Sequence, residues 1–183
     1  VAPHGYGDGN GAYGATQNLV DAFFTRDGLP IDEDPSYVAA GYSTEDVHYP
    51  NTSWTRSNSK EIKGLVTEAG TPNMYCNREP RFYVSVLWHG EYSTQMEDHV
   101  DFLYGGANGG PTYDSPQCGY LMRKRQHPQS TELGNQNHPY RHGIIFRLGE
   151  FYLSYAEAMN EYYGPAGHGE ALKYLNAIRE RAG

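Results

Sequence analysis

The chain has 183 residues and a formal net charge of −8, from 14 Lys and Arg against 22 Asp and Glu. A pI of about 5.4 argues against nucleic-acid binding, which needs a clustered basic face, and a mean hydropathy of −0.74 with no long apolar run excludes a membrane span. The 22 Gly and 11 Pro indicate many loops, whereas 17 Tyr, 6 Phe and 2 Trp exclude a plainly disordered chain.

The first expected elements are a Gly-rich loop over residues 1–15 and a short helix that follows it. Thr16 has the side chain to cap this helix, which would extend to Phe24. Its apolar face would consist of Leu19, Ala22 and Phe23. The sequence Asp27–Pro30 then predicts a turn, because Gly and Pro favour turn conformations.

The middle of the chain is less regular. A polar segment over residues 57–69 permits a helix, and residues 78–88 form the clearest strand candidate. In that strand the apolar side chains of Phe82, Val84 and Val86 would share one face. Residues 104–116 are again rich in Gly, Pro and Tyr and predict a loop, and residues 118–125 predict a second short strand.

Two amphipathic helices are expected at the end of the chain. Apolar positions follow helical spacing from Ile144 to Tyr162, Gly164-Pro165 ends that helix, and a second one follows over 169–181. A helix pair of this size has the dimensions of one tetratricopeptide-type unit, which needs partners to bury both faces. We therefore expect a loop-rich region over 1–143 and a tetratricopeptide-like helix pair over 144–183, as parts of one larger domain.

The ends of the sequence suggest a piece of something longer. Val1 is not an initiating Met, and the last residues stop at the close of a helical pattern. The two cysteines, Cys76 and Cys118, allow one internal disulfide, and their spacing does not decide whether it forms.

Several motifs together resemble the SusD/RagB family of outer-membrane glycan-binding lipoproteins of Bacteroidetes. They occur in the family's order and spread from residue 16 to residue 183. The matching segments are Thr16–Phe23, Asn77–Tyr83, Gly119–Lys124, Arg147–Glu161 and Leu175–Gly183. Several such matches in order make an accidental resemblance improbable.

The resemblance implies a mainly α-helical fold with tetratricopeptide-like helix pairs, a large loop-rich region and a few short strands. It also implies a non-enzymatic protein of polysaccharide utilisation and nutrient uptake, which binds a starch-type or other oligosaccharide and needs no cofactor. The partner would be a SusC-like TonB-dependent transporter. The place would be the surface of the outer membrane, reached through an N-terminal lipid anchor that is absent from this chain.

Sugar binding needs flat aromatic faces for stacking and planar polar groups for hydroxyl pairs. The candidates for ligand contact are Trp54, Tyr49, Tyr42, Asn51 and Trp88. We favour Trp54 and Tyr49 because they belong to a long polar loop, where an exposed ring would have a function. The alternative for both is packing in a small irregular core, and Trp88, at the end of a strand, is expected in the core.

Catalysis and metal binding are not expected. Glu150 and Glu157 share a helix face about 10.5 Å apart, which is too far for a glycosidase pair, so we assign them to a structural network with Arg179 and Arg181 of the next helix. His138 and His142 have the spacing of a helical zinc pair, but a proline lies between them. Asp8–Gly11 begins like a calcium loop but lacks the later ligands.

Two alternatives to a glycan-binding protein stay open. A glycan-active hydrolase would use the same aromatic residues together with the 22 acidic ones. A structural module would dock on the transporter and leave the sugar site to sequence outside this chain.

Overall fold

The computed structural model describes residues 11, 13–49, 64–93, 96, 98–112, 114–123, 139–140 and 142–182. The chain forms two compact units, unit 1 over residues 1–139 and unit 2 over residues 140–183. Among the described residues, 36 % are helical and 15 % are in strands, so helix is the more abundant class, as expected.

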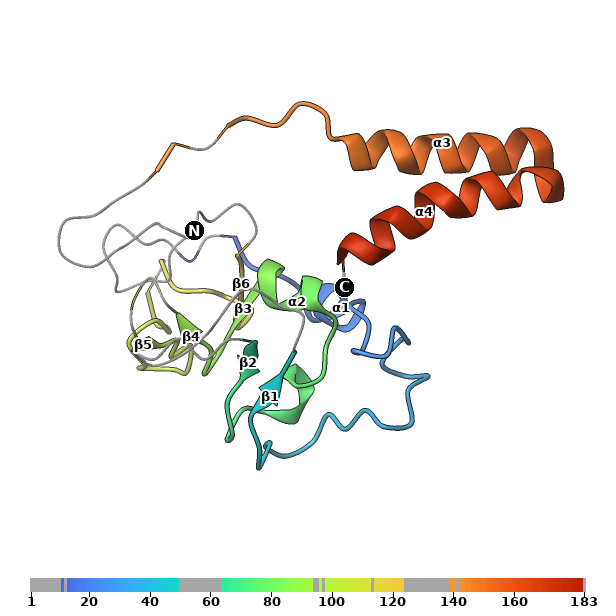
Figure 1. The fold of residues 1–183 in the computed structure, drawn as a ribbon. Coiled ribbons are helices and arrows are strands. Elements are labelled where there is room, and N and C mark those ends of the chain that lie inside the picture. Colours follow the sequence, from blue (N-terminus) through green and yellow to red (C-terminus); the bar gives the residue numbers. More distant parts are fainter. Residues whose placement is uncertain are drawn as a thin grey trace. The chain divides into compact units, whose positions relative to one another are not determined.

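Unit 1 consists of short elements joined by loops (Figure 1). Its helices are α1 (Gln17–Asp21), the 3-10 helix η1 (Asn73–Tyr75) and α2 (Pro80–Ser85). Its strands are β1 (Val47–His48), β2 (Leu65–Thr67), β3 (Val86–Trp88), β4 (Tyr92–Ser93), β5 (Asp98–His99) and β6 (Tyr120–Met122). The strands form three antiparallel pairs, β1 with β2, β3 with β6 and β4 with β5.

Helix α1 begins as predicted, because the Thr16 side chain accepts a hydrogen bond from the main-chain N–H of Leu19. The predicted apolar face is wrong, since the buried residue of this helix is Val20, while Leu19 is 44 % exposed. A helix of five residues is too short for periodicity to fix its orientation. The predicted turn at residues 27–30 is present, and Gly28 has the positive φ of 78° that glycine adopts at little cost.

The segment 78–88 is a strand only at its end. Residues 80–85 form α2, with Pro80 in the first turn, where a missing N–H is tolerated. The neighbouring side chains of Phe82 and Tyr83 are both buried, which a strand with one covered face does not allow. The helix expected within 57–69 is also wrong in its described part, because residues 65–67 form β2. Strand β6 confirms the strand expected within 118–125.

The core of unit 1 is a cluster of aromatic rings. The ring of Phe82 stacks on Trp88 at 5.1 Å between centroids, and Tyr83 meets Trp88 edge-on at 5.6 Å. Other buried members are Val20, Tyr49, Val66, Tyr75, Val86 and Tyr120. Edge-on and stacked ring pairs add to the energy of apolar burial, so a few large residues hold together a unit with little regular structure. Several of the chain's 17 tyrosines therefore belong to the core.

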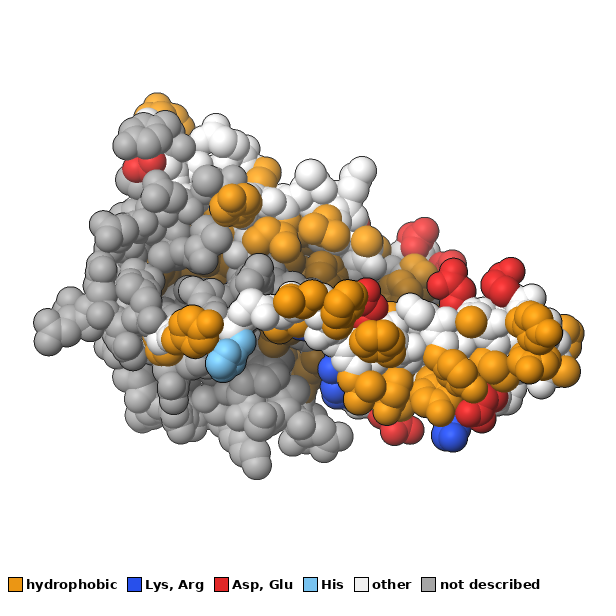
Figure 2. Space-filling view, turned by 90° about the horizontal axis from the view of Figure 1, so that it is seen from above, with side chains coloured by type: hydrophobic (Ala, Val, Ile, Leu, Met, Phe, Trp, Pro, Cys, Tyr) orange, Lys and Arg blue, Asp and Glu red, His pale blue; other side chains and the backbone are white. Residues whose placement is uncertain are grey.

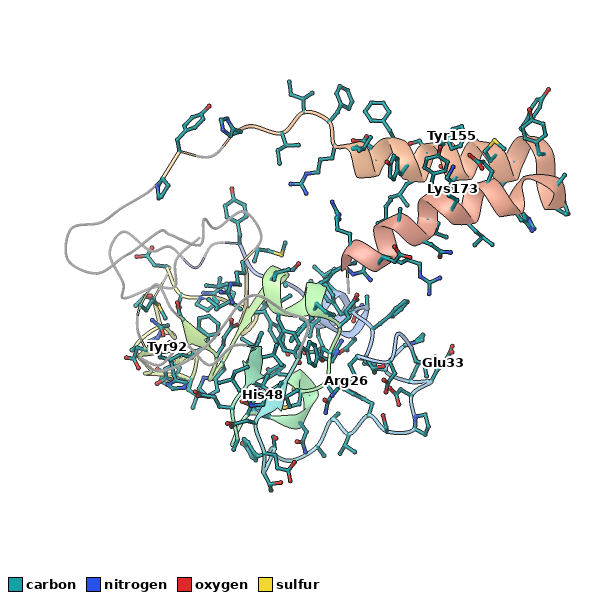
Figure 3. All side chains as sticks on the ribbon, viewed as in Figure 1. Arg26, Glu33, His48, Tyr92, Tyr155 and Lys173 are labelled. Atoms are coloured by element: carbon teal, nitrogen blue, oxygen red, sulfur yellow. The ribbon has the colours of Figure 1, made fainter. Side chains whose placement is uncertain are left out.

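Unit 2 is a helical hairpin of α3 (Leu148–Tyr163), the 3-10 turn η2 (Gly164–Gly167) and α4 (His168–Ala182) (Figure 1). Helix α3 begins four residues later than the periodicity suggested, because Arg147, the N-cap, has extended backbone angles. Tyr155 of α3 contacts the ring of Tyr174 at 4.9 Å, and Lys173 of α4 lies beside the same ring (Figure 3). The tetratricopeptide-like character of this pair stays a prediction.

Candidate functional site

A polar groove of about 490 Å³ lies in unit 1. Its walls come from two stretches of chain, the loop after α1 and the segment that contains η1. The residues that line it are Thr25, Arg26, Asp34, Ser36, Tyr37, Val38, Asn73, Cys76 and Asn77. Arg26 projects from the loop after α1, and Glu33 lies farther along the same loop (Figure 3). We call this site the polar groove.

One side of the polar groove rests on a buried arginine. Arg78 is completely buried, and its guanidinium donates to the carbonyls of Val20 at 2.6 Å, Phe23 at 2.7 Å and Met74 at 3.1 Å. These carbonyls belong to α1, to the residues after it and to η1, so one side chain joins the two stretches that form the groove. No carboxylate is paired with Arg78 among the described residues, and carbonyl dipoles together with the rings of Tyr37 and Phe82 compensate its charge.

Tyr37 separates Arg78 from the polar groove. The guanidinium carbon of Arg78 lies 5.6 Å from the centre of the Tyr37 ring, within the range of a cation–π contact. The Tyr37 hydroxyl donates to the carbonyl of Met74 at 3.2 Å. Burial raises the pKa of this hydroxyl, so Tyr37 stays neutral at physiological pH.

The acidic residue of the polar groove, Asp34, accepts hydrogen bonds from a residue of its own loop. One oxygen of Asp34 accepts hydrogen bonds from the Ser36 N–H at 2.8 Å and from the Ser36 hydroxyl at 2.6 Å. The hydroxyl of Ser36 is the main cause that lowers the pKa of the Asp34 carboxyl. Asp34 is therefore an ionised acceptor at neutral pH, unsuited to act as a general acid.

The polar groove also contains two amides, those of Asn73 and Asn77, and the guanidinium of Arg26. The Asn73 side chain donates to the carbonyl of Ala40 at 2.7 Å, which fixes it to the neighbouring loop. Asn77 has a positive φ of 52°, a conformation that asparagine tolerates better than most residues. Arg26 lies over the Tyr49 ring at 5.2 Å and donates to the Asn77 side-chain oxygen at 3.4 Å.

Together these groups can bind a ligand but are poorly suited to cleave one. Hydroxyl, amide, carboxylate and guanidinium groups line one groove, and they offer the mixture of donors and acceptors that a sugar's hydroxyl groups need. Cys76 does not supply a nucleophile, because burial raises the pKa of its thiol. Cys76 and Cys118 are free thiols, the second of them exposed. Within the described ranges, no three His, Cys, Asp or Glu side chains gather as metal ligands would.

The five predicted ligand contacts fall in different places. Tyr49 is only 7 % exposed and its hydroxyl donates to the carbonyl of Arg78, so it belongs to the core, the alternative considered for it. Trp88, 1 % exposed, is in the core as expected. Neither ring has a free face in this structure for stacking on a sugar. Asn51 and Trp54 lie outside the described residues.

Among the predicted contacts that the structure describes, Tyr42 is the one with an exposed ring. It is 71 % exposed and pairs through its backbone with Pro72. The preceding residue, Gly41, accepts a hydrogen bond at 3.0 Å from the main chain of Asn73, a residue of the polar groove. The backbone of Tyr42 therefore lies next to the segment that contributes Asn73 to the groove.

The residues that line the polar groove were missed from the sequence. Arg26 and Asn77 are 51 positions apart, and no motif spacing connects them. The one signal was the segment Asn77–Tyr83, which contains the buried Arg78 and marks where the two stretches of chain meet.

The polar network predicted for unit 2 is wrong. Glu150, Glu157, Arg179 and Arg181 are all exposed. In the described part of unit 2 the ion pair is another one, Lys173 with Glu170 at 3.7 Å. These charges are solvated because the face they occupy is not covered within the hairpin.

Unit 2 carries an apolar groove of about 550 Å³ between its helices. Its lining consists of Leu153, Ala156, Glu157, Asn160, His168, Ala171, Leu172 and Leu175. Figure 2 shows hydrophobic side chains gathered along the hairpin. Large exposed hydrophobic residues of α3 are Leu148, Phe151, Leu153, Tyr155, Tyr162 and Tyr163. Exposed apolar surface of this extent is typical of an interface. No helix among the described residues is both long and apolar enough to span a bilayer.

Comparison with known proteins gives a family and a fold. The model described as the SusD family matches residues 2–183. A search of curated proteins returned no match. Two solved structures of BT4246, a Bacteroides SusD-like protein, are similar to this chain, one of them with selenomethionine. Their TM-scores are 0.65 and, for the selenomethionine form, 0.64, at 22 % and 23 % sequence identity.

The similarity extends over most of this chain but a minor part of the other protein. Both alignments cover 93 % of this chain, but only 27 % and 28 % of BT4246. The chain thus spans a little over a quarter of the length of the structures it resembles, and the likeness bears on the fold of that part.

Proposed function

The chain belongs to the SusD family, and we propose that it forms part of a non-enzymatic glycan-binding protein of polysaccharide utilisation. The observation that carries this proposal is the polar groove, where neutral, anionic and cationic hydrogen-bonding side chains line one site and the backbone of the exposed Tyr42 pairs with the residue before Asn73. Binding sites of this kind hold a ligand by a few placed polar groups and an apolar surface.

The oligosaccharide would lie with one sugar face against Tyr42 and its hydroxyl groups toward the polar groove. Asn73 and Asn77 would accept and donate through their amides, and Asp34 would accept. Trp54 and Asn51 follow Tyr49 closely in sequence, and we propose them as further contacts from the adjoining loop.

We further propose that the whole protein delivers its glycan to a SusC-like TonB-dependent transporter at the surface of the outer membrane, held there by an N-terminal lipid anchor. Family membership supports this association in general terms. The glycan would be an oligosaccharide, with starch-type glucans among the candidates.

The hairpin of unit 2 supports a second role beside glycan binding. We propose that α3 and α4 form one tetratricopeptide-like pair, in which the exposed apolar face packs on a neighbouring surface. That surface would be another helix pair of the same protein or the transporter. If the hairpin alone carried the function, the chain would be the structural docking module and would bind no sugar.

Isothermal titration against a glycan panel tests the proposal on both the chain and the full-length protein. We expect heat of binding with at least one oligosaccharide, and about a tenfold weaker affinity for Tyr42→Ala, the loss of about 1.4 kcal/mol that one ring contact provides. Tyr104→Ala is the matched control, because that ring is 85 % exposed and lies outside the polar groove.

Three further results would extend, replace or refute the proposal. A large loss of affinity in Trp54→Ala would extend the site into the adjoining loop. Release of reducing ends from a bound polysaccharide would replace the proposal with a hydrolase. Absence of binding by the full-length protein to every glycan would refute glycan capture altogether.

A further inference from the structure

Arg26, in the lining of the polar groove, is a cation without an anionic partner among the residues that the structure describes. Its polar contacts are the Asn77 side-chain oxygen at 3.4 Å and, through the main chain, the Asn77 carbonyl at 2.8 Å. Among the residues that the structure describes, the ion pairs of other basic side chains are Arg81 with Glu79, Arg123 with Glu91 and Lys173 with Glu170, and none includes Arg26. Unlike Arg179 and Arg181 of the exposed hairpin, Arg26 lines a groove, where its free N–H groups are available to a ligand.

The carboxylates near Arg26 do not neutralise it. Asp34, the acidic residue of the polar groove, is engaged with Ser36 through two hydrogen bonds of 2.8 and 2.6 Å. Asp27, the next residue in sequence, forms no ion pair with Arg26 in the described structure. The Arg26 guanidinium lies over the Tyr49 ring at 5.2 Å, and one of its N–H groups donates to Asn77, so other N–H groups can donate to a ligand.

A second positive charge lies behind the same groove. Arg78 donates to three carbonyls and pairs with no carboxylate of the described residues, and it contacts the ring of Tyr37, which lines the groove. The lining of the groove thus contains one guanidinium, that of Arg26, and one carboxylate, that of Asp34, with the Arg78 guanidinium behind Tyr37. A buried charge is poorly screened by salt, so Arg78 adds to the attraction of Arg26 for an anion.

We propose that the glycan bound in the polar groove is acidic, with a sugar carboxylate that accepts hydrogen bonds from the Arg26 guanidinium. This inference rests on the proposed glycan-binding function and adds the chemical class of the ligand. A planar guanidinium and a carboxylate form a two-point, charge-assisted pair, which a neutral sugar does not reproduce. A uronic acid residue in the chain of the glycan would supply that carboxylate.

The test compares acidic oligosaccharides with their own neutral forms. Oligogalacturonate, alginate and hyaluronan oligosaccharides are titrated beside their carboxyl methyl esters, so that each pair shares one backbone and differs in charge. Neutral glucan and xylan oligosaccharides complete the panel. The proposal predicts that at least one acidic form binds ten times or more tightly than its ester, the factor of one charge-assisted hydrogen bond.

Arg26→Gln should remove this preference, so that the acidic form and its ester bind the variant with similar affinities. Arg81→Gln is the control, an exposed arginine that is paired with Glu79 and lies outside the groove lining. Arg26→Lys keeps the positive charge but loses the planar pair of N–H donors, so it should retain part of the preference for the acidic form. Circular dichroism of each variant shows that it is folded.

The outcomes separate this inference from the function on which it rests. If neutral glycans bind and no acidic form exceeds its ester, the ligand class is refuted while glycan binding stands. If the preference exists but survives Arg26→Gln, the assignment to Arg26 is refuted. If no glycan of either kind binds, the proposed function fails and the ligand class fails with it.

Discussion

Replacing Arg78 by methionine should destabilise unit 1 more than the loss of any surface charge. The guanidinium is completely buried and donates to three carbonyls, those of Val20, Phe23 and Met74. Methionine fills much of the volume of the arginine stem but removes the charged donor from all three carbonyls. The Phe23 carbonyl is then left without a donor among the described residues, while those of Val20 and Met74 keep the longer hydrogen bonds from the Phe23 N–H at 3.4 Å and the Tyr37 hydroxyl at 3.2 Å.

The size of the effect follows from those three contacts. A buried acceptor left unsatisfied costs about 1–3 kcal/mol, and part of the total is regained because a buried charge is no longer desolvated. We expect the free energy of unfolding to fall by about 3–5 kcal/mol, which is a large share of the 5–15 kcal/mol typical of a domain. Arg81→Met is the control, because its exposed ion pair with Glu79 contributes less than about 1 kcal/mol.

Urea unfolding followed by tryptophan fluorescence is the assay, since both tryptophans of the chain belong to unit 1. With a slope of about 2 kcal/mol per M, Arg78→Met should lower the midpoint by roughly 2 M and Arg81→Met by less than about 0.5 M. If the two variants unfold at the same urea concentration, Arg78 does not hold the two stretches of the polar groove together.

Three other predictions concern burial and backbone packing. Cys118 should react with a thiol reagent in the folded chain at least tenfold faster than Cys76, which is buried and has a raised thiol pKa; equal rates would contradict that burial. Burial raises the pKa of Tyr49 to about 12, so the folded state holds its proton above the unfolded value near 10. Through this residue the free energy of unfolding should fall by about 2 kcal/mol as pH rises from about 10 to about 12, and Tyr49→Phe should make that fall smaller in alkaline urea titrations. Gly167→Ala would place a Cβ 2.4 Å from a carbonyl of α3 and should cost about 1–3 kcal/mol in thermal melts at 222 nm, whereas Gly169→Ala meets no atom within 4 Å and should be neutral or stabilising.

The helices of unit 2 could be predicted because their signals are local. Apolar spacing and the Gly164-Pro165 stop are enough to place α3 and α4, and only the first turn of α3 differs. In unit 1 the local signals conflict with tertiary packing. Residues 80–85 alternate like a strand in sequence, but the aromatic core buries Phe82 and Tyr83 together and Pro80 starts a helix.

The site was less predictable than the fold. Aromatic residues in polar loops were the natural candidates, yet Tyr49 supplies the ring on which Arg26 stacks and not an exposed platform. Asp34 and Asn73 line the same groove although they are far apart in sequence. Their two stretches of chain are held together by the buried guanidinium of Arg78, which donates to carbonyls of both. Such a contact of three carbonyls with one guanidinium has no periodic signature in the sequence.

A heteronuclear NMR titration of the chain with an acidic oligosaccharide, selected by calorimetry, tests the central claim most directly, because it reports where a sugar binds. The account predicts that the side-chain signals of Asn73, Asn77 and Arg26 shift with glycan concentration, and that those of Asn176 in α4 do not. Shifts confined to residues outside the polar groove, or no shifts at a concentration that saturates binding in calorimetry, would contradict it.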